Sequence, residues 1–184
     1  AETVYKDVAF GPRNLGLSGE EVDALVRSSL ERVGLSFDEL AEKSPFELSG
    51  GQQRRVAFAG VLAMEPRLLI LDEPMAGLDH AMRQELLAVF DHLHSQGITL
   101  LLATHDIDFA YRWAERIHLI DAGVCTASLA AAELAHADAQ LAALGMPLPS
   151  AVAVHRSLVA HGLLPAQPIP RSQAELLELL ATSP

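Results

Sequence analysis

Residues 68–74, Leu-Leu-Ile-Leu-Asp-Glu-Pro, join a short apolar run to two acidic residues. Such a run is typical of a strand that is buried on both faces of a parallel sheet. A second apolar run, Leu100–Ala103, follows, and between the two runs Asp79 can cap a helix over residues 80–96. Strand, helix and strand in this order form a βαβ unit, so the sequence predicts an α/β fold with a parallel sheet.

Further helix and strand signals surround this unit. Ser18 and Glu21 have the spacing of a capping box, and apolar residues then recur on one helical face, which predicts a helix over residues 19–33. Ser36 and Glu39 repeat the signal for a shorter helix. The other expected elements are a helix from about Gln52 that ends at Pro66, a helix near residues 107–115, strands over residues 117–120 and about 124–127 joined by a turn at 121–123, and a last helix opened by Ser172 and Glu175.

The composition bounds the class of protein. The 184 residues fit one domain with a short appendage, and half of them are hydrophobic, which excludes global disorder. A formal net charge of -11 opposes binding to nucleic-acid phosphates. The longest apolar stretch, Val56–Met64, is far shorter than the roughly 20 residues of a membrane-spanning helix, so we expect no direct membrane insertion. The lone Cys125 is expected to be a small buried residue of a reduced compartment, with the cytoplasm as the default.

A glycine-containing segment, Leu-Ser-Gly-Gly-Gln-Gln-Arg-Arg at residues 48–55, is placed to bind phosphate. Ser49, Gly50 and Gly51 lie where a helix begins, and unpaired N–H groups and the helix dipole favour an anion there. Arg54 and Arg55 are expected to make the site still more positive. The alternative is a glycine-rich loop that Ser49 caps for structural reasons alone.

Two acidic residues, Asp72 and Glu73, end the first predicted strand, at the edge where open α/β sheets hold their ligands. One carboxylate can hold a hydrated magnesium ion, while its neighbour orients an attacking water and accepts a proton from it. His105 follows the second strand and could reach a phosphate from that edge. The alternatives are a polar strand end, with Pro74 starting a turn, and a structural histidine.

Together these motifs resemble an ABC-type ATPase. The resemblance lies in a signature loop at residues 48–52, a Walker B strand at 68–73, a D-loop at 76–79 and a switch histidine at His105, all in the family order. Residues 7–17 also resemble a segment typical of the energy-coupling-factor and cobalt or nickel importer ATPases.

The resemblance implies a P-loop ATPase-like parallel sheet over residues 1–128, with a helical signature subdomain at about 13–66 and the Walker B, D-loop and switch-histidine part at about 67–128. Residues 129–184 would be a helical, proline-rich appendage. No Gly-x-x-x-x-Gly-Lys-Ser/Thr pattern occurs. We therefore expect an N-terminally truncated sequence that lacks the first strands and the P-loop, and that is inactive alone.

The family pattern also implies roles for single residues. In the family two ATPase subunits meet head to tail, so the signature loop would contact ATP on the second subunit. Asp72 would hold Mg²⁺ through water, and Glu73 and His105 would serve hydrolysis. The residues concerned are Ser49, Gly50, Gly51 and Gln52 in the signature loop, Asp79 in the D-loop, and Asp72, Glu73 and His105. The turn of Phe10, Gly11 and Pro12 is expected either in the core or against a partner.

The function implied by the resemblance is the ATP-hydrolysing subunit of a transporter that imports cobalt, nickel or a vitamin, with transmembrane subunits as partners and a place on the inner face of the cell membrane. A soluble ABC ATPase of DNA repair or translation is an alternative, against which the charge of -11 and the segment Phe10–Leu17 count. A second alternative is a non-hydrolysing partner that lends only its signature loop. Glu73 and His105 count against it, since such a partner need not keep them.

Overall fold

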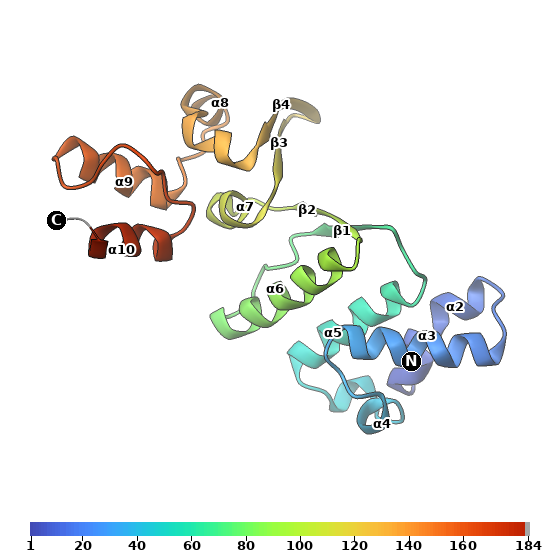
Figure 1. The fold of residues 1–184 in the computed structure, drawn as a ribbon. Coiled ribbons are helices and arrows are strands. Elements are labelled where there is room, and N and C mark those ends of the chain that lie inside the picture. The colour runs from blue at the N-terminus through green and yellow to red at the C-terminus, as the bar shows by residue number, and fades with distance from the viewer. Residues whose placement is uncertain (183–184) are drawn as a thin grey trace. The chain divides into compact units, whose positions relative to one another are not determined.

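The computed structural model describes residues 1–182. These residues form two compact units, Ala1–Ala103 and the part of the chain from Thr104 onward. Helices combine with small sheets in both units (Figure 1), and the predicted α/β class is confirmed. The functional boundary expected between residues 128 and 129 is a different division and stays a prediction.

The first unit opens with a helical layer. Its elements are α1 (Val4–Val8), α2 (Phe10–Asn14), α3 (Gly19–Arg32), α4 (Phe37–Leu40), a 3-10 turn η1 (Pro45–Glu47) and α5 (Gly50–Leu62). The predicted capping box of α3 forms, because Ser18 and Glu21 exchange hydrogen bonds, and these bonds lower the pKa of Glu21. The predicted box of α4 does not form: the Ser36 side chain makes no cap bond, and the single turn closes instead through the N–H of Ala41 on the carbonyl of Phe37.

Helix α5 is the centre of this layer, with α1 and α3 packed on it. It begins two residues before the expected Gln52, because Ser49 is its N-cap. A Cβ on Gly60 would lie 3.9 Å from backbone atoms of Asp7 and Val8, which brings α1 close to α5. The side chains buried here are Val4, Val8, Val22, Val26, Leu30, Val56, Phe58, Ala59 and Leu62.

The predicted βαβ motif completes the first compact unit, Ala1–Ala103. Strands β1 (Leu68–Asp72) and β2 (Thr99–Ala103) pair in parallel, and α6 (His80–Ser95) connects them. Asp79 caps α6 by accepting the N–H of Met82 at 2.8 Å, as the sequence predicts. Phe90 of α6 packs against Phe58 of α5 edge to face, with ring centroids 5.6 Å apart. This contact joins the βαβ motif to the helical layer.

The two faces of this sheet are covered unequally. The apolar run of β1 is typical of a strand buried on both faces, yet Ile70 is 66% exposed and Leu68 and Leu101 are also exposed. Leu69, by contrast, is buried. The described sheet has two strands, and no described helix of the first unit covers the face that carries Ile70, in keeping with a chain expected to lack the first strands and the P-loop.

The second unit combines a β-hairpin with helices. Its elements are α7 (Ile107–Trp113), β3 (Arg116–Asp121), β4 (Val124–Ala130), a 3-10 helix η2 (Ala131–His136), α8 (Asp138–Ala143), α9 (Ser150–Ala160) and α10 (Gln173–Thr182). Ala122 and Gly123 both have positive φ, which gives the tight hairpin turn between β3 and β4. Arg171 closes α7 by donating to the carbonyls of Tyr111 and Ala114.

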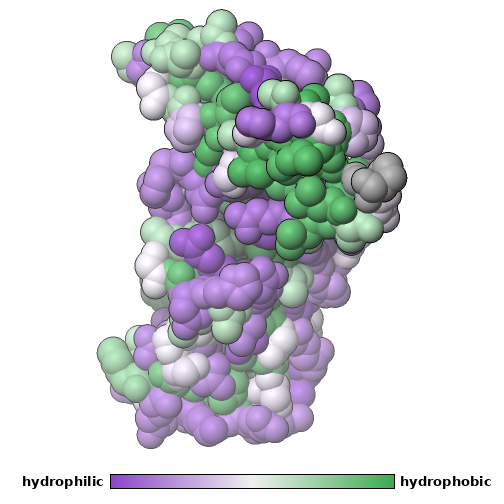
Figure 2. Space-filling model, turned by 90° about the vertical axis from the view of Figure 1, so that its left-hand side faces the viewer, coloured by the Kyte–Doolittle hydropathy of each residue, from purple (hydrophilic) through white to green (hydrophobic). Residues whose placement is uncertain are grey.

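The second unit exposes a cysteine and several apolar side chains on its surface. Cys125 is exposed, so its expected burial is wrong: the first half of β4 is exposed, and the part that lies nearer η2 is better covered. Apolar side chains are exposed on α9, on α10 and between them, and Figure 2 shows an apolar area over this part of the unit. None of the helices in the described chain is both long enough and apolar enough to cross a membrane.

The bare sheet face generates a first prediction. Replacing Ile70 by Lys should reduce self-association of the 184-residue chain, because this side chain offers exposed apolar surface beside strands that can pair with another copy. Size-exclusion chromatography with light scattering measures the change. Phe46→Ser is the matched control, since Phe46 is 87% exposed and lies outside the sheet. An equal effect of both substitutions would contradict a specific role of the sheet face.

Candidate functional site

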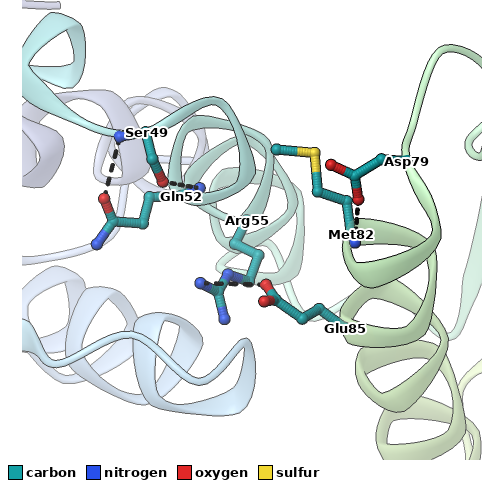
Figure 3. Close-up of polar contacts among 6 residues, drawn as sticks. All are labelled: Ser49, Gln52, Arg55, Asp79, Met82 and Glu85. Atoms are coloured by element: carbon teal, nitrogen blue, oxygen red, sulfur yellow. Dashed lines mark hydrogen bonds and ion pairs between the residues drawn. The ribbon is translucent and has the colours of Figure 1, made fainter.

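The first part of the candidate site is the capped glycine turn, residues 48–52, at the start of α5. The Ser49 hydroxyl accepts the N–H of Gln52 at 3.3 Å, and the side-chain oxygen of Gln52 accepts the N–H of Ser49 at 3.1 Å (Figure 3). The N–H groups of Gly50 and Gly51 donate to no acceptor within residues 1–182. Two donors therefore remain at the positive end of the helix dipole, where an anion is favoured.

The fold itself does not require glycine at these two positions. Neither residue has a positive φ. A Cβ on Gly50 would meet nothing within 4 Å, and a Cβ on Gly51 would make ordinary contacts with Met82 and Glu85, at 3.9 and 4.0 Å. A glycine in a helix costs up to about 1 kcal/mol relative to alanine. The missing side chains leave the turn open to close approach from outside the chain.

Arg55 does not add free positive charge to the turn, contrary to the expectation. Its guanidinium lies 3.7 Å from the Glu85 carboxylate of α6, and Figure 3 shows the two side chains pointing toward one another. The Arg55 side chain is 24% exposed, and its Nε atom is buried without a hydrogen-bond partner in the described chain. The ion pair neutralises one of the two charges, those of Arg54 and Arg55, that the sequence assigned to phosphate binding.

The second part of the site is the carboxyl end of β1. Asp72 is the last strand residue and is exposed, and Glu73 follows it half-buried. The N–H of Glu73 donates to the Ala103 carbonyl of β2 at 2.9 Å, while its φ of 45° lies in the left-handed region that glutamate seldom adopts. Such a conformation costs on the order of 1 to 3 kcal/mol and is typical of functional sites.

The remaining predicted residues lie on either side of β2. Asp79 is exposed and caps α6, so its carboxylate fixes the start of that helix. His105 is exposed in the loop that follows β2 and belongs to the second unit, whereas Asp72, Glu73, Asp79 and the capped glycine turn all belong to the first. The described residues contain no group of three His, Cys, Asp or Glu side chains that could hold a metal ion.

A groove lies at Phe10–Pro12, where the sequence predicted a turn and the structure has the first residues of helix α2 instead. Phe10 is 69% exposed, which decides against a core position for its ring, whereas Pro12 is buried. Gly11 lets α2 approach Met64 closely, because a Cβ would lie 2.8 Å from Cγ of Met64 and the methionine side chain would have to shift to make room. The groove has a volume of about 390 Å³ and is lined by Asp7, Phe10, Gly11, Asn14, Leu15, Ala57, Gly60, Val61 and Met64.

Sequence reasoning missed two parts of this arrangement. The α5 side of the groove escaped notice because the sequence has no signal for it: Val61 and Met64 lie in a continuous apolar stretch, and only the structure shows that both are exposed. The Arg55–Glu85 pair escaped because its partners are 30 positions apart on different helices. No local spacing rule connects residues at that separation.

Known proteins resemble the chain in sequence and in fold. Residues 2–76 match the family model described as ABC transporter. The chain is 44% identical over 97% of its length to the energy-coupling factor transporter ATP-binding protein EcfA2 of Streptococcus pyogenes serotype M3, and it covers 63% of that protein. It therefore spans less than two thirds of the length of this curated relative.

Solved structures show the same fold. CbiO1 from Clostridium perfringens, described as part of the ABC transporter complex cbiONQ, superposes with a TM-score of 0.67 at 34% identity, over 85% of this chain and 62% of that one. MJ1267, an ATP-binding cassette of an ABC transporter, superposes with a TM-score of 0.66 at 22% identity, over 79% of this chain and 63% of that one, which speaks for the fold alone.

The glycine turn generates a second prediction, on folding. Gly50→Ala should leave the free energy of unfolding unchanged or raise it by up to about 1 kcal/mol, because the added methyl group has room and alanine favours the helix. Gly19→Ala is a matched control, since Gly19 is also the first residue of a serine-capped helix with nothing within 4 Å of an added Cβ. Denaturant unfolding of the two variants compares them. Destabilisation by Gly50→Ala alone would mean that the fold does need this glycine.

Proposed function

This chain belongs to the ABC transporter ATPase family, and on that premise we propose that it is part of the ATP-hydrolysing subunit that drives import through a membrane transporter. The observation that carries the proposal is the capped glycine turn, with two free N–H donors at a helix start and no side chain in front of them. An exposed phosphate fits such a surface.

In this proposal the turn acts on ATP that a second ATPase subunit holds in a head-to-tail dimer. Gly50 and Gly51 offer backbone N–H groups to the terminal phosphate, and the Ser49–Gln52 capping box holds both donors in place. Substitution at the turn should therefore affect turnover without changing the fold of the chain that carries it.

The acidic strand end fits the need for Mg²⁺ and for a base. Mg²⁺ commonly binds through one or two carboxylates, water and substrate phosphates, so the single exposed carboxylate of Asp72 is sufficient on the protein side. When bound, the ion would neutralise charge on the phosphates. Glu73 is assigned the base that orients water and accepts its proton, since its backbone is anchored to β2, and His105 is assigned to phosphate contact.

We assign residues 1–128 to the ATPase part and residues 129–184 to an appendage. The cargo proposed is a cobalt or nickel ion or a vitamin, in keeping with the energy-coupling factor relative. The subunit would lie in the cytoplasm against the inner face of the cell membrane. A soluble ABC ATPase that handles nucleic acid is disfavoured by the charge of -11, and a non-hydrolysing partner by the presence of Glu73 and His105.

The groove at Phe10–Pro12 is proposed to receive a transmembrane subunit. Phe10 and Leu15 are both more than 60% exposed at its rim, and Met64 is exposed in the turn that follows α5. A short helix with apolar side chains fits a groove lined in this way. This contact would connect events at the nucleotide to the membrane part of the transporter.

The third prediction tests the catalytic assignment in the full-length subunit with its partners. Glu73→Gln should retain ATP binding and lower kcat by about 100-fold or more, because the amide cannot accept the proton from water. His105→Ala should also lower kcat. Calorimetry and phosphate release separate binding from turnover. The 184-residue chain alone, which carries no P-loop motif, is the control and should give no heat with Mg-ATP. Turnover near wild type in the glutamine variant would remove Glu73 from this role.

The fourth prediction tests the groove. Phe10→Ser should weaken co-purification of the subunit with the transmembrane part while its thermal midpoint stays nearly constant, because the ring contributes little to the core. Phe46→Ser again serves as the control, since Phe46 is exposed but does not line the groove. Equal recovery of the complex with wild type and Phe10→Ser would exclude Phe10 from the interface.

A further inference from the structure

We propose that Arg55 and Glu85 are a pair of positioning residues that hold the capped glycine turn in fixed alignment with the start of α6. The inference rests on the proposed function and adds residues to it. Neither side chain is assigned to contact with nucleotide. Both act through the backbone segments that they join.

The geometry brings the two helix starts together in one place. An added Cβ on Gly51 would lie 3.9 Å from Cε of Met82 and 4.0 Å from Oε2 of Glu85, so the turn lies directly against the first turns of α6. Met82 is the residue whose N–H Asp79 caps. Arg55 follows Gly51 by one helical turn on α5 and reaches Glu85, as Figure 3 shows.

The pair therefore connects two segments with separate tasks in the proposed dimer. The glycine turn serves ATP on the other subunit, and Asp79 follows the acidic end of β1, which serves ATP on the same subunit. Phe58 and Phe90 supply an apolar contact between α5 and α6, but ring packing alone permits sliding along the helix axes. A charged pair with a defined partner fixes the register of the two helices.

Stability of the isolated chain does not explain Arg55. Its buried Nε has no hydrogen-bond partner in the described part of the chain, and an unsatisfied buried donor is unfavourable. Glu85 is 57% exposed, so solvent screens the pair. A long apolar side chain would fill the same space between the helices without that cost. The arginine is thus better accounted for by alignment than by folding.

The experiment uses the full-length subunit assembled with its partners. Arg55→Gln and Glu85→Gln should each lower kcat by roughly 10- to 100-fold, as expected for a misplacement of about 1 Å, and should leave the KM for ATP within about threefold of wild type. The exchanged pair Arg55→Glu with Glu85→Arg should recover most of the lost kcat. Arg27→Gln is the matched control, because Arg27 pairs with Asp38 at 3.0 Å in the same unit but joins neither segment.

A second measurement does not depend on ATP hydrolysis. Spin labels at Ala57 and Ala88, which are exposed on α5 and α6, report the separation of the helices by pulsed electron paramagnetic resonance after Cys125 is replaced by Ser. This measurement uses the full-length subunit without its transmembrane partners, because Ala57 lines the groove proposed to receive them. The distance distribution should broaden in Arg55→Gln and narrow again in the exchanged pair. An unchanged distribution in Arg55→Gln, or single variants with wild-type kcat, or an exchanged pair no better than the single variants, would overturn the inference. A wild-type subunit that hydrolyses no ATP would instead refute the proposed function, and the resonance result would still decide the alignment.

Discussion

Five residues of β1 lie beside five of β2 in parallel register, and parallel neighbours require a crossover, which here is α6. Because α6 follows β1, it begins at the carboxyl edge of the sheet, where Asp72 and Glu73 also lie. The Ala103 carbonyl at the end of β2 then holds the backbone of Glu73. The glycine turn at the start of α5 packs against the first turns of α6. The strand pairing thus brings the acidic strand end and the start of α6 to one edge of the sheet.

Elements whose signals are local could be predicted from the sequence. Ser18, Ser49 and Asp79 cap the helices that follow them, because a cap depends on a side chain and an N–H group only two or three positions away. Strand β1 was predicted to within one residue for a similar reason, since its apolar run and acidic end are contiguous. Helices α1 and α2 were not predicted, because each has five residues and shows too little periodicity to be recognised.

Properties that depend on distant parts of the chain could not be predicted. The apolar character of Ile70 indicates that it can be buried, but its exposure depends on which elements cover the sheet. The same holds for Cys125 on the hairpin and for Phe10, for which the sequence left core and surface positions open. The positive φ of Glu73 has no sequence signal either, since glutamate seldom adopts this backbone conformation.

Local choices that disagree with the needs of the fold are concentrated near the candidate site. Two glycines start a helix that would accept alanine, a glutamate adopts a left-handed backbone, and an arginine buries a donor that has no partner within residues 1–182. Each choice costs stability, and sequences that fold well avoid such costs where nothing else requires them. The first two lie where the proposed function places a phosphate and an attacking water, and the arginine lies one turn after the glycines on α5. Arg55 lies next to the glycine turn and, like the two glycines, lowers the stability of the isolated chain. These two facts link it to the turn better than its positive charge does, because Glu85 neutralises that charge.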